Sequence, residues 1–67
     1  MSQPAPIDAL DVLVVEDDPA LRDVLVLHLN ADGCAARAVD DGERALQACR
    51  ERLPDVLVLD VMLPGRN

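Results

Sequence analysis

The chain has 67 residues, of which 51% are hydrophobic, and it carries a formal net charge of −7. This length allows one small domain, and the hydrophobic share is too high for a disordered chain, so we expect a packed core. No aromatic residue is present, which excludes base stacking, and the negative charge disfavours binding to nucleic acid or to anionic membranes.

The sequence shows no targeting pattern. Its first residues lack a basic region followed by an apolar run, and no apolar run approaches the length of a membrane span. Cys34 and Cys49 have neither C-x-x-C nor zinc-site spacing, so we expect each to act as a small buried hydrophobic residue. We therefore expect a cytoplasmic protein.

Three short apolar runs alternate with two segments of helical pattern. We expect strands at 12–15, 34–39 and 56–59, and helices at 19–31 and 42–52. Residues 1–10, with two prolines and little pattern, are expected to form a flexible tail before the folded part at 11–67. The β-α-β-α-β order predicts an α/β fold in which parallel strands are joined by right-handed crossovers.

Each expected helix should bury one apolar stripe. In the first helix the spacing predicts five inward-facing residues: Leu21, Val24, Leu25, His28 and Leu29. Val26 and Leu27 lie on the other side, either as a contact surface or as scattered exposed residues. In the second helix the pattern predicts that four residues face inward: Ala45, Leu46, Cys49 and Leu53.

Acidic residues directly follow the first and third expected strands. Glu16 and Asp17 come after the first strand, and Asp60 comes after the third. If these strands are parallel neighbours, the three carboxylates meet at the carboxyl edge of the sheet, where open α/β sheets bind ligands. Carboxylates at such short separations repel one another unless a cation compensates for their charge, and hard oxygen ligands suit Mg²⁺. Taken alone, Asp60 is better explained as a loop residue or a helix cap than as a ligand.

Asp18 has its own explanation. The pair Asp18-Pro19 fits the N-cap and first position of a helix. Capping by Asp18 and cation binding by Glu16 and Asp17 are compatible.

Three motifs occur in order along the chain: VVEDDP at 14–19, DGERAL at 41–46 and LDVMLPG at 59–65. With them, residues 11–65 resemble a CheY-like receiver domain of the response regulators of two-component systems. The resemblance implies a flavodoxin-like, doubly wound parallel sheet of strand order 2-1-3-4-5. Only the 2-1-3 half is expected here, since the chain stops before the fourth and fifth strands.

The resemblance also implies roles for individual residues. Asp60 would accept a phosphoryl group from the phosphohistidine of a sensor histidine kinase. Glu16, Asp17, Asp60 and the backbone carbonyl of Met62 would hold Mg²⁺, which is needed because the attacking carboxylate and the phosphoryl group are both negative. The family is a phosphoacceptor that catalyses its own phosphorylation and dephosphorylation, rather than an enzyme acting on a separate substrate.

The chain also departs from the family pattern. It ends at Asn67 and contains no lysine, whereas receivers use a hydroxyl residue and a lysine after the later strands to contact the phosphoryl oxygens. We therefore expect impaired phosphotransfer, and an open third-strand edge that favours a homo-oligomer. The alternative is a self-associating fragment without phosphotransfer activity. An aspartyl phosphatase is disfavoured, because Met62 stands where such enzymes place a second acid.

Overall fold

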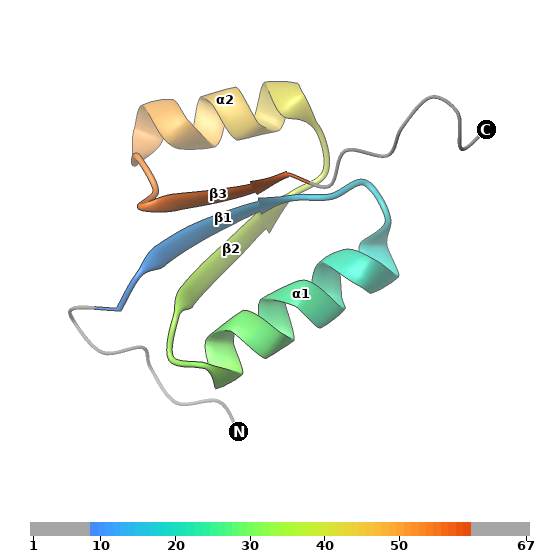
Figure 1. The fold of residues 1–67 in the computed structure, drawn as a ribbon. Coiled ribbons are helices and arrows are strands. Elements are labelled where there is room, and N and C mark those ends of the chain that lie inside the picture. The colour runs from blue at the N-terminus through green and yellow to red at the C-terminus, as the bar shows by residue number, and fades with distance from the viewer. Residues whose placement is uncertain (1–8, 60–67) are drawn as a thin grey trace.

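The computed structural model describes residues 9–59. Its five elements are β1 (Asp11–Val15), α1 (Pro19–Ala31), β2 (Ala35–Val39), α2 (Gly42–Glu51) and β3 (Val56–Leu59), shown in Figure 1. This is the predicted β-α-β-α-β order. Most of the expected tail, Asp60 and Met62 lie outside the described residues.

The sheet has three parallel strands in the order β2-β1-β3, which confirms the predicted 2-1-3 arrangement. Val15, the last residue of β1, pairs with Val39 on one side and with Leu59 on the other. The three strands therefore end at the same level, and the loops that follow β1 and β2 leave from one edge. The two helices cover opposite faces of the sheet (Figure 1).

The core is built on β1. Leu13 and Val14 are fully buried, with Val12 and Val15 nearly so. A central parallel strand covered on both faces needs apolar side chains at every position, which explains the unbroken run. On the α2 side, Leu13 and Val15 pack against Ala45.

Helix α1 begins and ends as the sequence predicts. Asp18 caps its start: Oδ1 accepts hydrogen bonds from the backbone N–H groups of Ala20 at 3.0 Å and Leu21 at 3.4 Å. Pro19 follows the cap, where the missing N–H costs no helical hydrogen bond. Gly33 has φ of +92° just beyond the helix, a conformation that glycine adopts without strain.

The packed side of α1 differs in part from the prediction. Four residues of the helix are half-buried: Arg22, Leu25, Val26 and Leu29. The prediction was right for Leu25 and Leu29 and wrong for three residues that are exposed, namely Leu21, Val24 and His28. Val26, which was predicted to lie on the other side, is half-buried instead. On the same side of the helix, Arg22 donates a hydrogen bond to the backbone carbonyl of Glu16.

Helix α2 packs on β1 and β2 and, in the described part of the chain, leaves β3 uncovered. Ala45 is buried as predicted and Cys49 faces inward but is only half-buried, whereas the prediction was wrong for Leu46 and Leu53, which are 59% and 77% exposed. Cys34 is also half-buried rather than buried, and both thiols are free.

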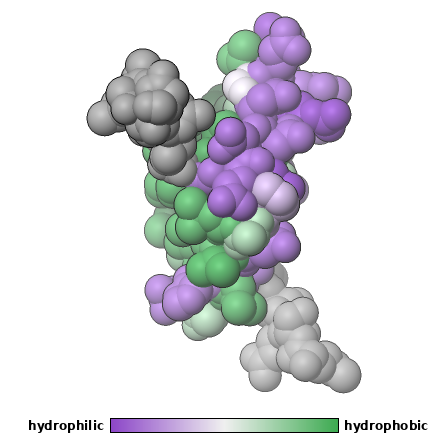
Figure 2. All heavy atoms as spheres, turned by 90° about the vertical axis from the view of Figure 1, so that its right-hand side faces the viewer, coloured by the Kyte–Doolittle hydropathy of each residue, from purple (hydrophilic) through white to green (hydrophobic). Residues whose placement is uncertain are grey.

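The uncovered strand leaves apolar surface exposed. On β3, Leu57 is 46% and Leu59 is 56% exposed. Figure 2 shows hydrophobic side chains gathered on one side of the face it presents, beside a band of hydrophilic ones.

Candidate functional site at the carboxyl edge of the sheet

The three acidic residues after β1 form a short loop at the carboxyl edge, and Glu16 organises it. Glu16 is 2% exposed. Its backbone N–H donates to the carbonyl of Val39 at 3.1 Å, which extends the contact between β1 and β2 beyond the strand end. Its carboxylate turns back over the loop, where Oε2 accepts a hydrogen bond from the Asp18 backbone N–H at 2.9 Å.

The other two acids have different surroundings. Asp18 is the cap of α1, which confirms the structural explanation of that residue. Asp17 lies between them and is exposed. Of three adjacent carboxylates, one orders the loop, one caps the helix, and that of Asp17 is open to a ligand from solvent.

The end of β3 lies beside this loop. Leu59 pairs with Val15, and each is followed directly in sequence by a residue predicted to bind metal, Asp60 and Glu16. Asp60 and Met62 are outside the described residues, so the structure brings together Glu16 and Asp17 of the predicted site and the strand end that precedes the others.

The two described acids have the donor chemistry for a hard cation. Carboxylate oxygens are the ligands that Mg²⁺ prefers, and Mg²⁺ takes few of them because it keeps several waters. Within residues 9–59, no group of three or more His, Cys, Asp and Glu side chains could hold a metal ion. Glu16 and Asp17 thus fit part of a magnesium site, and a further protein ligand would come from outside this range.

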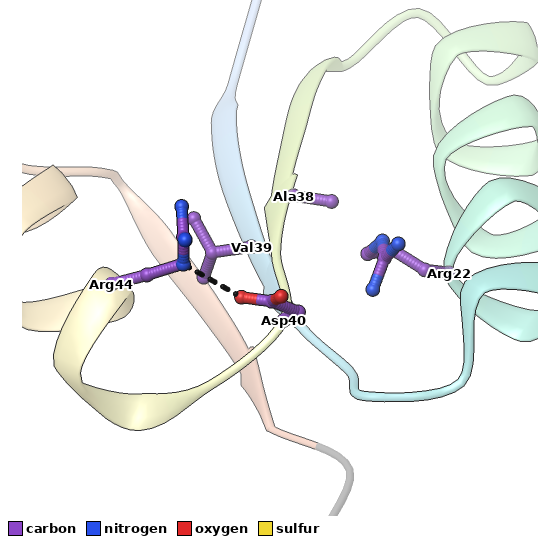
Figure 3. A pocket seen from close by; sticks show the side chains of 5 residues that line it. All are labelled: Arg22, Ala38, Val39, Asp40 and Arg44. Carbon is purple, nitrogen blue, oxygen red and sulfur yellow. Dashed lines mark ion pairs between the residues drawn. The ribbon is translucent and has the colours of Figure 1, made fainter.

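A shallow hollow of about 200 Å³ lies at the same edge (Figure 3). Five residues line it: Arg22, Ala38, Val39, Asp40 and Arg44. On one wall, Arg44 Nε lies 3.2 Å from Asp40 Oδ1, in an exposed ion pair. On the other wall, Arg22 Nη1 donates to the backbone carbonyl of Glu16 at 3.0 Å. Arg22 was not identified from the sequence. Its spacing from Leu25, Val26 and Leu29 places it on the same side of a helix as these residues, and this is the signal that could have found it.

Comparisons with known proteins agree with this arrangement. The response regulator receiver domain family matches residues 12–67. The chain belongs to this family. It is 46% identical over 56 residues to the DNA-binding response regulator MtrA of Mycolicibacterium smegmatis, a match that covers 84% of this chain and 25% of MtrA.

A second relative is the transcriptional regulatory protein CseB of Streptomyces coelicolor, 47% identical over 58 residues, or 87% of this chain and 25% of CseB. The chain thus spans about a quarter of the length of these curated relatives. No solved structure matches it at a comparable level of significance.

Receiver domains are the phosphoacceptors of two-component systems, and the family generally binds Mg²⁺. The resemblance seen in the three motifs is therefore confirmed, together with the partial flavodoxin-like fold. Within the described residues, none of the helices combines the length and apolar character needed to cross a membrane.

Proposed function

We propose that this receiver accepts a phosphoryl group on Asp60 from the phosphohistidine of a sensor histidine kinase in the cytoplasm. Glu16, Asp17, Asp60 and the backbone carbonyl of Met62 would hold Mg²⁺. The observation that carries this proposal is the parallel pairing of Val15 with Leu59. These two strand ends lie at the same level of the sheet, and each is followed in sequence by an acid.

The described residues support this function in distinct ways. Glu16 stabilises the acidic loop by accepting a hydrogen bond from Asp18 N–H. Asp17 presents an exposed carboxylate at the edge. When bound, Mg²⁺ offsets the negative charge between a carboxylate nucleophile and a phosphoryl group. In the transfer, the N–P bond to histidine breaks as a bond forms between phosphorus and a carboxylate oxygen of Asp60.

These 67 residues contain no lysine, the residue type with which the family contacts the phosphoryl oxygens. A lysine contact would stabilise the negative charge on the phosphoryl oxygens in the transition state, so without it these 67 residues should be phosphorylated more slowly. The proposal is therefore a phosphoacceptor of reduced activity. DNA binding, which MtrA has in its name, is not proposed for these residues of net charge −7.

Intact-mass measurement after incubation with acetyl phosphate and Mg²⁺ tests the phosphoacceptor directly. We expect one phosphoryl adduct on the 67-residue chain, lost in Asp60→Asn and retained in Asp23→Asn, which removes an exposed acid of α1. An adduct that persists in Asp60→Asn, or a parent chain that forms none, would show that the assignment is wrong.

The metal ligands need their own test. Mg²⁺ binding by calorimetry should be weak in the parent chain and absent in Asp17→Asn, while Asp23→Asn binds like the parent. Equal binding by the parent and Asp17→Asn would refute the proposed ligand set.

A second candidate function is a self-associating module without phosphotransfer activity. It is favoured by β3, which within residues 9–59 pairs with β1 alone and exposes Leu57 and Leu59. An open apolar strand edge is a template for pairing with another chain, most simply as a two-fold dimer. A monodisperse monomer in light scattering at tens of micromolar protein would rule this out. Magnesium binding separates the candidates, since an inert module would not respond to the ion.

A further inference from the structure

Arg22 reaches from the first turn of α1 back to the loop that precedes the helix. Its side chain is half-buried, and Nη1 donates a hydrogen bond of 3.0 Å to the backbone carbonyl of Glu16. In Figure 3 it comes from α1 toward the end of β2, on the opposite side of the hollow from Arg44. An arginine held by one backbone carbonyl beside several acids calls for an explanation beyond packing.

The position of that carbonyl supplies one. The carbonyl of Glu16 belongs to the peptide unit that joins Glu16 to Asp17, and a peptide unit is planar. Fixing the carbonyl oxygen therefore fixes the orientation of the Asp17 N–H and the direction in which the chain enters Asp17. The same residue, Glu16, is fixed at its N–H by Val39 and at its carboxylate by Asp18, so the Arg22 bond completes the constraint.

We propose that Arg22 is a positioning residue of the receiver site: it holds the Glu16–Asp17 peptide so that the Asp17 carboxylate faces a divalent cation, and it thereby sets the cation affinity. This inference rests on the proposed magnesium site, which it deepens. Partners of metal ligands that fix ligand orientation act in this way at other metal sites, and their loss weakens binding by about tenfold or more.

The positive charge of Arg22 has the opposite effect on cation affinity from that of its hydrogen bond. The direction in which the Kd for Mg²⁺ changes therefore tests the inference. A guanidinium beside the acidic loop repels a divalent cation, so removing the charge alone would strengthen Mg²⁺ binding. Removing the hydrogen bond would weaken it. Arg44 provides the matched control, because it lies on the other wall of the same hollow and forms its ion pair with Asp40 rather than with the loop.

Mg²⁺ titration of the 67-residue chain should therefore compare Arg22→Ala, Arg22→Lys and Arg44→Ala. We expect Arg22→Ala to raise the Kd for Mg²⁺ about tenfold, Arg22→Lys to raise it less because lysine keeps one donor, and Arg44→Ala to leave it unchanged or lower it. Arg22→Ala binding as tightly as the parent, or more tightly, would overturn the inference.

Amide exchange in the metal-free protein distinguishes a local effect of Arg22 on the acidic loop from a loss of the fold. In metal-free protein, amide exchange at Asp18, whose N–H is bonded to Glu16, should accelerate in Arg22→Ala and stay unchanged in Arg44→Ala. The amide of the buried Val14 reports whether the sheet remains folded. Unchanged exchange at Asp18 in Arg22→Ala would also overturn the inference.

The outcome with Asp17→Asn distinguishes failure of the proposed metal site from failure of the positioning role of Arg22. If that variant binds Mg²⁺ like the parent, the proposed metal site is wrong, and the role of Arg22 in cation affinity is wrong with it. If Asp17→Asn weakens binding and Arg22→Ala does not, the metal site stands and the positioning role alone is refuted.

Discussion

Asp11 and Arg37 form an ion pair at the amino-terminal end of the sheet, with Asp11 Oδ1 3.0 Å from Arg37 Nε. Arg52, at the end of α2, approaches the other oxygen of the same carboxylate at 3.0 Å. Asp55 joins them, since its carboxylate accepts a hydrogen bond from the Asp11 N–H and its own N–H donates to the Asp11 carbonyl, both at 2.8 Å. The network links all three strands at the end opposite the acidic loop, so it stabilises the sheet without being part of the site.

This network predicts sensitivity to acid. Burial raises the pKa of Asp11, but hydrogen bonding and charge attraction from Arg37, with a further contribution from Arg52, outweigh it and hold the pKa below the ordinary value of 3.8. A carboxyl whose pKa is lowered by folding stabilises the fold above its unfolded pKa, and this stabilisation is lost as the pH falls through the folded pKa. We expect urea midpoints of the parent chain to be constant near neutral pH and to fall below about pH 4.

Asp11→Asn should lower the urea midpoint at pH 7 and flatten its dependence on pH in the acid range. Asp23→Asn, an exposed acid on α1, is the control and should keep the parent's profile. An Asp11→Asn variant with the same acid dependence as the parent would show that other carboxyls govern acid unfolding.

The centre of β1 should be the position least tolerant of truncation. Leu13 is fully buried, and Leu→Ala at such sites costs about 2–5 kcal/mol. A domain this small has little stability to lose. We therefore expect circular dichroism to show Leu13→Ala largely unfolded at about 25 °C. Leu27→Ala, at a side chain that is 67% exposed, should change the unfolding free energy by no more than about 0.5 kcal/mol.

The strand order could be predicted from sequence, but the packed face of α1 could not. The strands are marked by unbroken apolar runs, and their order followed from the family resemblance. In α1, apolar residues occur almost all the way round the helix, from Leu21 to Leu29, so periodicity allowed more than one inward face. The face observed is the one that lets Arg22 bond to Glu16, a contact that hydrophobic periodicity does not contain.

The site was predictable to a similar degree. Parallel neighbouring strands place the ends of β1 and β3 at one edge, which the apolar pattern predicts once the family resemblance supplies the strand order. The inward turn of the Glu16 carboxylate onto Asp18 depends on the conformation of a three-residue loop. In the Asp11 network, Arg37 and Arg52 lie 26 and 41 positions along the chain from Asp11. Patterns in a single sequence carry no information at such separations.

The two helix caps predict separable effects on stability and on cation binding. Asp18→Ala removes the acceptor of the Ala20 and Leu21 N–H groups and should cost about 1 kcal/mol in urea unfolding. Asp41→Ala removes the corresponding bond from Arg44 N–H at α2 and should cost a similar amount. If Asp18 is only a cap, Mg²⁺ affinity should be equal in the two variants. Selective loss of Mg²⁺ binding in folded Asp18→Ala would instead make Asp18 a ligand.

The open side of β3 predicts how self-association can be blocked. Leu57 is 46% exposed on β3, and charged side chains on an edge strand prevent pairing with another chain. We expect Leu57→Glu to shift the light-scattering mass from a dimer or larger species to the monomer.

Any added negative charge also raises the general repulsion between chains of net charge −7, so the control must change the charge equally. Leu27→Glu does so on α1, at another exposed leucine. If it dissociates the chain as fully as Leu57→Glu, the effect is one of net charge and the β3 edge is not the interface. If Leu57→Glu alone gives the monomer while circular dichroism shows both variants folded, the chains associate through β3.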